Sequence, residues 1–124
     1  MLEIFKAHIK LNFPTLFRDK ILLACSGGID SMVLTHLCQK LNLKITLAHC
    51  NFCLRGDESN MDEAFVVGYG SKQNILVFSK QFDTQSFADN SKHSIQMAAR
   101  ELRYNWFQSL SAVSYTHLTL PTKA

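Results

Sequence analysis

The chain has 124 residues, of which 47% are hydrophobic and 19% charged, and its formal net charge is +3. This length allows one small domain with a single core, and the composition excludes a disordered chain. The sequence has no apolar run near the roughly 20 residues that span a bilayer, and Lys6, His8 and Lys10 interrupt the apolar positions that a signal peptide would need. We therefore expect a cytoplasmic protein without membrane association. The mild positive charge is compatible with a polyanionic partner and does not identify one.

The spacing of apolar residues predicts the secondary structure. Continuous apolar runs bounded by charge or glycine are typical of strands buried on both faces, and apolar residues at helical spacing predict amphipathic helices. In chain order we expect a helix over 1–11, a strand over 21–25, a helix over 30–42, a strand over 44–49, a helix over 59–70, a strand over 75–78 and a helix over 94–110. Polar loops are expected over 50–58 and between the last strand and the last helix.

The third expected helix has the clearest start signal. Ser59-Asn60-Met61-Asp62 matches a capping box, and Gly70 is expected to end the helix. Met61, Phe65 and Tyr69 are predicted to form its inner face.

The alternation of strands and helices predicts the fold class. Strand, helix, strand, helix, strand, helix indicates right-handed βαβ units and an open parallel sheet, a doubly wound α/β fold. We assign this domain to residues 1–110. Residues 111–124 continue neither pattern and resemble a translated adapter or cloning scar, so we expect a non-native or disordered tail there. A native but loosely ordered C-terminus is the alternative.

Ser26-Gly27-Gly28-Ile29-Asp30-Ser31 follows the first expected strand and precedes a helix. Two glycines let the backbone turn sharply and approach a ligand, and the N–H groups at a helix start favour phosphate oxygens. Ser26 and Ser31 add hydroxyl groups, and Asp30 offers a carboxylate that suits magnesium. The segment is neither a Walker loop nor G-x-G-x-x-G. The alternative is a tight turn before a serine-capped helix.

This segment matches S-G-G-x-D-S and is similar to the PP-loop of the N-type ATP pyrophosphatases, which cradles the pyrophosphate part of ATP. Two further segments narrow the resemblance. Residues 49–59 resemble the H-x-N-H-x-L-R-x-x-S segment of the tRNA(Ile)-lysidine synthetases, and residues 98–104 resemble their A-A-R-x-x-R-Y helix. The resemblance covers residues 21–110. Phe52 stands where that family often has a second histidine, which weakens any role for a paired histidine.

The resemblance implies an adenine nucleotide alpha hydrolase-like, Rossmann-like sheet, of which this chain would hold an incomplete N-terminal part. It implies ATP and Mg²⁺ as cofactors, and a tRNA(Ile) with a wobble cytidine and free L-lysine as partners. ATP would adenylate the cytidine, and lysine would displace AMP to form lysidine. A homodimer is one arrangement that the resemblance allows for the full-length protein. Because the family continues into a histidine- and aspartate-rich segment, we expect this chain alone to form no lysidine.

The resemblance also implies roles for single residues. ATP or pyrophosphate would be held by Ser26, Gly27, Gly28, Ile29, Asp30 and Ser31. Asp30 and Arg100 would be catalytic, with Asp30 also placing magnesium, and His49, Asn51, Arg55 and Arg103 would contact the nucleotide or the tRNA. Four of these side chains also have an interpretation without function. His49 could be a strand-end histidine with a backbone partner, Arg55 a solvated loop charge, and Arg100 and Arg103 part of a solvated helix face.

Cys50 and Cys53 form a lone C-x-x-C. A redox pair or half of a zinc site is the functional interpretation, but Cys25 and Cys38 do not form the second close pair that zinc would need. We favour two incidental cysteines. Two other functions stay open: another PP-loop tRNA-modifying enzyme such as a tRNA thiolase, for which these cysteines would matter, and a non-enzymatic nucleotide-binding module.

Overall fold

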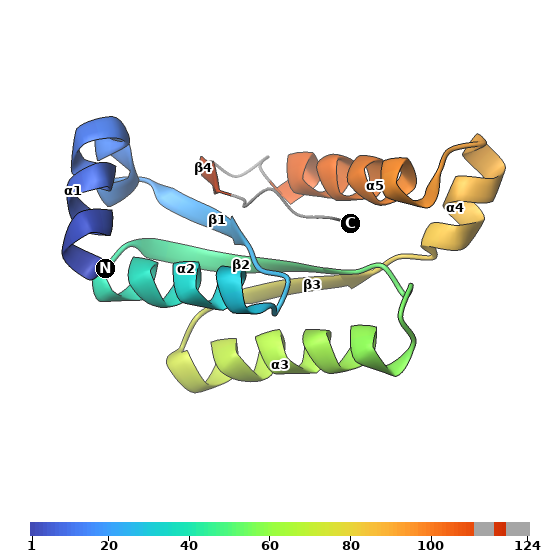
Figure 1. Cartoon of the computed structure of the whole chain (residues 1–124), viewed down its shortest axis with the longest axis horizontal. Helices are drawn as coiled ribbons and strands as arrows, with labels where there is room; N and C mark the ends of the chain where they lie inside the picture. Colours follow the sequence, from blue (N-terminus) through green and yellow to red (C-terminus); the bar gives the residue numbers. More distant parts are fainter. Residues whose placement is uncertain (111–115, 119–124) are drawn as a thin grey trace.

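A parallel sheet lies at the centre of the structure (Figure 1). The computed structural model describes residues 1–110 and 116–118. Over these residues the sheet has four strands in the order β3-β2-β1-β4, and each neighbouring pair is parallel. The strands are β1 (Lys20–Ala24), β2 (Lys44–Asn51), β3 (Val77–Gln81) and β4 (Thr116–Leu118). The predicted open parallel α/β fold is confirmed.

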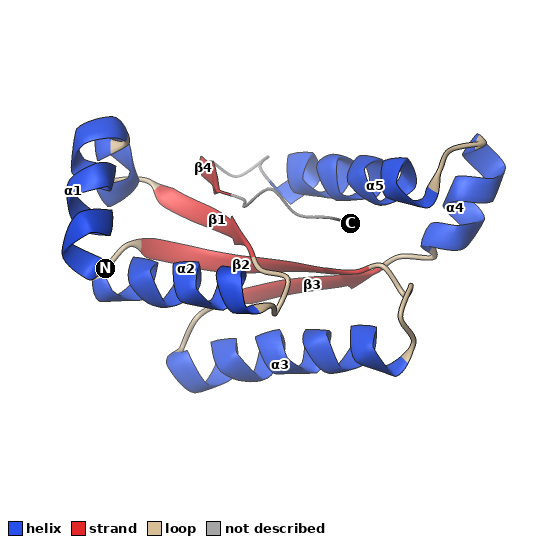
Figure 2. Cartoon of the chain, in the orientation of Figure 1, coloured by secondary structure: helices blue, strands red, loops and turns tan. Residues whose placement is uncertain are grey.

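Helices cover both faces of this sheet (Figures 1 and 2). The helices are α1 (Leu2–Asn12), a 3₁₀ helix (Pro14–Phe17), α2 (Ile29–Lys40), α3 (Asp57–Gln73), α4 (Thr84–Ser91) and α5 (Ile95–Leu110). The crossover helices α2 and α3 lie along one face, and α5 lies over the other. None of the helices in the described part of the chain has both the length and the apolar character needed to cross a bilayer.

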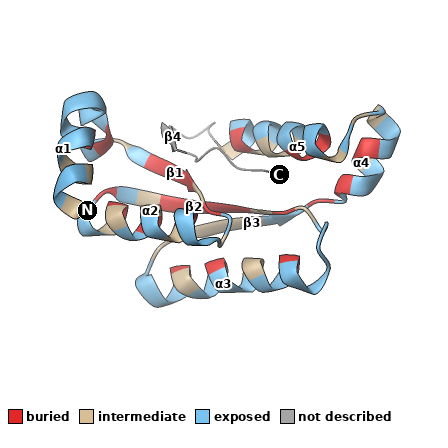
Figure 3. Cartoon of the chain, in the orientation of Figure 1, coloured by how far each residue is buried: buried red, intermediate tan, exposed pale blue. Residues whose placement is uncertain are grey.

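The central strand is apolar on both faces because both are covered. Ile21, Leu22 and Leu23 are fully buried and point alternately to the two sides of the sheet. Ile21 and Leu23 pack in a core with residues of α1, α2 and α3, whereas Leu22 packs against Phe107 of α5. Burying one such side chain is worth about 1.5–3 kcal/mol. Buried positions accordingly follow the strands and the inner faces of the helices (Figure 3).

The start of α3 differs from the prediction. The helix begins at Asp57, after the N-cap Gly56. The capping-box prediction for Ser59 is wrong, because Ser59 lies inside the first turn and its Oγ accepts a hydrogen bond of 3.0 Å from the Arg55 N–H. Gly56 has φ +55°, in the left-handed region, which turns the chain into the helix earlier than the motif suggested.

The inner face of α3 was also predicted wrongly. Met61 and Phe65 are 69% and 54% exposed, whereas Val66 is fully buried. Tyr69 is only partly buried at the edge of the core. The buried stripe consists instead of Ser59, Val66 and Gly70.

Gly70 lies inside α3 and does not end it. A Cβ atom there would clash with the Cγ2 atom of Val77 and would lie 2.9 Å from the Ile75 carbonyl oxygen. Glycine therefore allows the helix to pass close to β3. The helix continues to Gln73 and ends at Asn74, whose φ of +57° is a common C-terminal cap conformation. The strand expected over 75–78 consequently forms over Val77–Gln81.

The polar segment before α5 is not a loop throughout, because Thr84–Ser91 forms α4. Asp83 caps this helix: its Oδ1 atom accepts a hydrogen bond of 3.2 Å from the Ser86 N–H. Ala88 and Thr84 are buried. The sequence did not predict this short helix because its composition is polar and its buried positions arise from tertiary packing.

Most of the expected tail, residues 111–115 and 119–124, lies outside the described residues. Its described part, Thr116–Leu118, is β4, which runs alongside Ile21–Leu23 of β1. The sequence pattern did not predict this strand. The non-native origin of residues 111–124 stays a prediction.

Candidate functional site

The Ser26–Ser31 loop occupies the position at which open α/β sheets bind ligands. It leaves the carboxyl end of β1 and enters α2. β1 lies between β2 and β4, so the sheet grows in one direction through β2 and β3 and in the other through β4. Ligands bind in such folds at the carboxyl ends of the strands where the strand order reverses. The local motif and the topology therefore select the same place.

Gly27 makes the sharp turn of this loop possible. Its φ is +90°, which side chains rarely adopt, and a Cβ atom there would lie 3.3 Å from the Asp62 carbonyl oxygen and 3.4 Å from the Val66 Cγ2 atom. Gly28 is different, because it has φ −77° as the N-cap of α2. The first glycine is thus required both by the backbone and by the nearby α3 helix.

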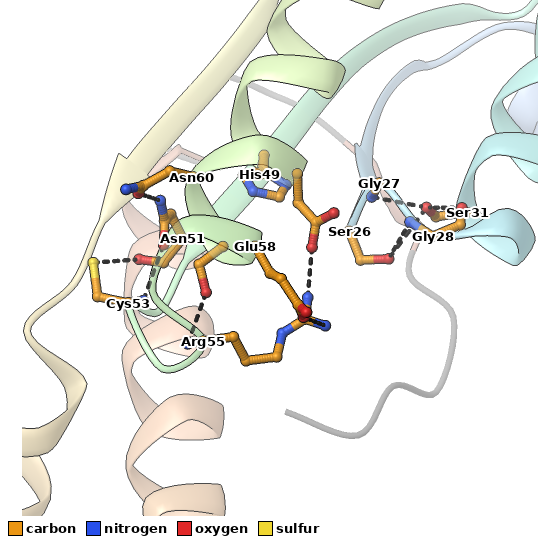
Figure 4. Close-up of polar contacts among 12 residues, drawn as sticks. Ser26, Gly27, Gly28, Ser31, His49, Asn51, Cys53, Arg55, Glu58 and Asn60 are labelled. Carbon is orange, nitrogen blue, oxygen red and sulfur yellow. Dashed lines mark hydrogen bonds and ion pairs between the residues drawn. The ribbon is translucent and has the colours of Figure 1, made fainter.

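In this loop, backbone N–H groups donate hydrogen bonds to the side-chain oxygens of the two serines (Figure 4). The Gly27 N–H donates to Ser31 Oγ, and the Gly28 N–H donates to Ser26 Oγ, each over 3.2 Å. Ser31 Oγ donates to the Gly28 carbonyl oxygen over 3.0 Å. Within the described chain, no side chain caps the first turn of α2. The loop therefore presents backbone N–H groups, some already paired with oxygen, beside the positive end of a helix dipole, as an anion site requires.

Asp30 and Ile29 lie exposed in the first turn of α2. No group of three or more metal-ligating side chains occurs among the described residues. Magnesium commonly takes one or two carboxylates and completes its shell with phosphate oxygens and water. The single exposed carboxylate of Asp30 fits that mode of binding.

His49 lies at the carboxyl end of β2 with an exposed fraction of only 2%. Its Nδ1 atom is 2.7 Å from the carbonyl oxygen of Cys25, the residue before the loop. Because a carbonyl can only accept, Nδ1 carries the hydrogen, and Nε2 is left as a buried acceptor without a partner among the described residues. The alternative of a strand-end histidine with a backbone partner accounts for Nδ1 and not for Nε2. Leaving such an atom unpaired costs about 1–3 kcal/mol.

Asn51 is 1% exposed at the end of β2, and its side chain is occupied by the protein. Its Nδ2 atom donates to Asn60 Oδ1 over 2.9 Å and to Glu63 Oε1 over 3.0 Å. Its Oδ1 atom accepts from the Cys53 N–H over 2.9 Å. In this arrangement Asn51 organises the following loop and does not face solvent.

Arg55 is the charged residue that the structure brings beside the Ser26–Ser31 loop from the segment after β2. Its guanidinium lies 2.5 Å from Asp62 Oδ2 and 3.4 Å from Glu58 Oε2. Asp62 is the same residue whose backbone lies against Gly27. The ion pairs with α3 therefore hold Arg55 in place, and its predicted contact with the nucleotide or the tRNA stays a prediction (Figure 4).

Arg100 and Arg103 lie on α5, over the face of the sheet opposite to α2 and α3 (Figure 1). Arg100 is exposed and Arg103 is half-buried. Burial raises the pKa of the Cys50 thiol to about 12, and the positive charge of Arg103 partly offsets that effect. The structure therefore places Arg103 near the carboxyl end of β2 on the α5 side, and the predicted roles of both arginines stay predictions.

The four cysteines are free. Burial raises the pKa of Cys38 to about 11, and that of Cys50 is also raised, whereas Cys53 is exposed. Thiols with such high pKa values are poor nucleophiles and poor metal ligands at neutral pH. This favours the interpretation of Cys50 and Cys53 as incidental.

Two acidic residues of α3, Asp62 and Glu63, were missed from the sequence. Asp62 pairs with Arg55, and Glu63 accepts hydrogen bonds from Asn51, Ser79 and Gln81. The signal that could have found Glu63 is the stripe Ser59, Glu63, Val66 and Gly70, which recurs at helical spacing. Placing the inner face on Met61 and Phe65 concealed this stripe.

Comparison with known proteins identifies the family of the chain. The family model described as the PP-loop domain matches residues 1–122. The chain belongs to the PP-loop family. Membership in this family implies ATP binding. The Ser26–Ser31 segment, which matches the PP-loop motif, is called the PP-loop below, and its contact with ATP stays a prediction.

Relatives of this PP-loop chain carry the name tRNA(Ile)-lysidine synthase. The relative from Bacteroides thetaiotaomicron is 44% identical over 100 residues, which cover 81% of this chain and 24% of the relative. The relative from Parabacteroides distasonis is 42% identical over 111 residues, covering 89% of this chain and 25% of the relative. The relative from Chlorobaculum tepidum is 44% identical over 105 residues, covering 81% and 32%. The chain thus spans about a quarter to a third of the length of these relatives.

Proposed function

We propose that this chain binds the triphosphate of ATP at Ser26–Ser31 and supplies the nucleotide-binding part of a cytoplasmic tRNA(Ile)-lysidine synthase. The observation that carries the proposal is the pairing of the Gly27 and Gly28 N–H groups with serine oxygens at the start of α2. Phosphate oxygens carry more negative charge than hydroxyl oxygens, so they would form stronger bonds with the same N–H groups. The names of the relatives support the choice of reaction.

The proposed reaction has two steps. ATP first adenylates the C2 oxygen of the wobble cytidine of tRNA(Ile), and pyrophosphate leaves. The ε-amine of free L-lysine then attacks C2, the bond from C2 to the adenylated oxygen breaks, and AMP leaves. Adenylation converts a poor leaving oxygen into a good one. Magnesium, when bound, would offset the negative charge that develops on the departing pyrophosphate.

Within this proposal the residues of the chain hold and orient the nucleotide. The N–H groups of Gly27, Gly28 and the first turn of α2 would take phosphate oxygens, and the hydroxyls of Ser26 and Ser31 would turn to donate to them. Asp30 would place the metal. Arg100, together with Arg103, is proposed to neutralise phosphate or position the tRNA. This role requires the substrate to extend over the carboxyl edge of the sheet toward α5.

His49 and Arg55 complete the proposed nucleotide site. The unpaired Nε2 atom of His49 would accept a hydrogen bond from a nucleotide hydroxyl or amine, which would relieve its desolvation cost. Arg55 would exchange one of its carboxylate partners for a phosphate oxygen. A tRNA thiolase is less well supported, because burial raises the pKa of the Cys50 thiol to about 12.

Calorimetric titration of the chain with ATP tests the binding proposal. We expect Asp30→Ala/Ser31→Ala to weaken ATP binding by at least about tenfold, or about 1.4 kcal/mol. Unchanged affinity would contradict the assignment of the loop.

A chimera tests the reaction. Residues 21–110 of this chain would replace the matching segment of the Bacteroides thetaiotaomicron relative, and lysidine would be measured in tRNA digests. We expect the chimera to form lysidine with release of AMP, and the same chimera with Asp30→Ala/Ser31→Ala to form none. We also expect the chain alone to bind ATP without forming lysidine. Lysidine formed by the chain alone would overturn that last expectation.

A further inference from the structure

Glu63 connects three elements at the carboxyl edge of the sheet. It lies on α3, and its carboxylate accepts hydrogen bonds from Asn51 Nδ2 and Gln81 Nε2, each over 3.0 Å, and from Ser79 Oγ. Asn51 belongs to β2, whereas Ser79 and Gln81 belong to β3. Three donors occupy most of the acceptor capacity of this carboxylate, so it is already committed to the protein.

Asn51 connects Glu63 to the loop that carries Arg55. Its Nδ2 atom is shared between Glu63 and Asn60, both on α3, and its Oδ1 atom accepts from the Cys53 N–H. Cys53 has φ +56°, a conformation that costs a non-glycine residue of order 1–3 kcal/mol and persists only when its surroundings hold it. The hydrogen bond from Cys53 to Asn51 is such a constraint.

The same helix forms the wall of the PP-loop. Asp62, adjacent to Glu63, lies against Gly27 through its backbone carbonyl and holds Arg55 through its carboxylate. The position of α3 relative to the strand ends therefore sets the space beside Gly27. It also sets the place from which Arg55 reaches the anion site.

We infer that Glu63 is a positioning residue of the nucleotide site: its carboxylate holds Asn51, and Asn51 holds the 52–56 loop that carries Arg55. The inference rests on the proposed ATP site for its functional consequence. It assigns no direct contact between Glu63 and the nucleotide. It predicts that ATP affinity depends on the hydrogen bond between Glu63 and Asn51 and not only on the stability of the fold.

The test exchanges the two partners of that link. Asn51→Asp places two carboxylates together and loses the pairing, and Glu63→Gln replaces the charged acceptor of Asn51 Nδ2 with a neutral amide oxygen and so weakens it. The double variant Asn51→Asp/Glu63→Gln restores one carboxylate and one amide with their places exchanged. We expect each single variant to lose about tenfold in ATP affinity and the double variant to return to within about threefold of wild type.

Two matched variants separate positioning from general stabilisation. Ser79→Ala removes a donor to Glu63 on the β3 side and leaves the Asn51 link in place, so it should lower the melting temperature and leave ATP affinity unchanged. Asp57→Asn removes an exposed charge from the first turn of the same helix and should change ATP affinity little, with a small loss of melting temperature because that charge lies at the positive end of the helix dipole. If ATP affinity instead followed the melting temperature across all variants, Glu63 would be only a structural residue.

Amide hydrogen exchange of the 52–56 segment provides a second measurement that does not require ATP. We expect faster exchange in both single variants and wild-type exchange in the double variant. If Glu63→Gln does not fold, Asn60→Ala replaces it, since exposed Asn60 supplies one acceptor to Asn51. We expect faster exchange of the 52–56 segment in this variant too. Wild-type protein that fails to bind ATP would refute the proposed function, whereas unchanged exchange in the variants would refute the positioning role alone.

Discussion

The carboxylate of Asp62 lies 2.5 Å from the guanidinium of Arg55, while the backbone carbonyl of Asp62 borders Gly27. One residue of α3 therefore joins the glycine turn of the PP-loop to the arginine of the segment after β2. The pair is partly solvated, with side-chain exposures of 61% for Arg55 and 36% for Asp62. A partly exposed ion pair of this kind contributes about 0–1 kcal/mol to stability, so Arg55 can change partners at small cost.

Asp62→Asn should therefore increase the affinity for ATP and pyrophosphate. The substitution frees the guanidinium from its shorter ion pair and removes a negative charge beside the anion site, for an expected gain of about three- to tenfold at low salt. Calorimetric titration at two salt concentrations measures it. Asp57→Asn, which removes a charge from the same helix away from this ion pair, is the control and should have a smaller effect. Weaker binding by Asp62→Asn would show that the ion pair positions Arg55 for the ligand and does not compete with the ligand for it.

The two glycines of the PP-loop should differ in their tolerance of alanine. Gly27→Ala forces a side chain into φ +90° and against the Asp62 carbonyl oxygen, so we expect a loss of about 1–3 kcal/mol of unfolding free energy and loss of ATP binding. Gly28→Ala has an ordinary φ and meets only Ser26 Oγ at 3.5 Å, so its unfolding free energy should be close to that of wild type. Urea unfolding followed by circular dichroism compares them. Equal stability of the two variants would contradict the close approach of α3.

The two nitrogens of His49 can be separated by substitution. Asparagine can keep a donor near the position of Nδ1, whereas glutamine can reach the position of Nε2 but lacks the donor to the Cys25 carbonyl oxygen. We expect His49→Asn to keep the melting temperature and to lose about tenfold in ATP affinity. His49→Gln should mainly lower the melting temperature. Retained ATP affinity in a folded His49→Asn protein would remove Nε2 from the nucleotide site.

Cysteine alkylation should be selective and should depend on pH. The pKa values of Cys38 and Cys50 are raised to about 11 and about 12, so at pH 8 only about one thiol in a thousand or fewer would be ionised at these two sites. We expect iodoacetamide to label exposed Cys53 first, and Cys38 and Cys50 only after unfolding, as read by peptide mass spectrometry. Rapid labelling of Cys50 at pH 8 would instead revive the thiolase alternative.

The same raised pKa values have a consequence for stability. The Cys50 thiol keeps its proton in the folded chain, whereas in the unfolded chain it ionises with the ordinary cysteine pKa of 9.0. The contribution of Cys50 is therefore complete below pH 9 and declines as the pH rises toward about 12. Cys50→Ala should reduce the loss of unfolding free energy between pH 8 and pH 10, which urea titrations measure. An unchanged pH dependence would show that burial of this thiol is not maintained.

The sequence by itself determined the α/β class, and it predicted the place and the chemistry of the nucleotide loop. These depend on local patterns: buried apolar runs, helical spacing and six consecutive residues from Ser26 to Ser31 between a strand and a helix. The tertiary structure alone decided which face of α3 is buried, the short helix α4, the unpaired Nε2 atom of His49, and the contacts of Arg55 and Glu63. Met61 and Phe65 have the spacing of a buried stripe, but the close passage of α3 over β3 at Gly70 turns another stripe inward. The physical reason is that side-chain pairing at the sheet edge joins residues that are distant in sequence. Apolar periodicity predicts which face of one element is buried, but it does not predict which partner a polar atom will have.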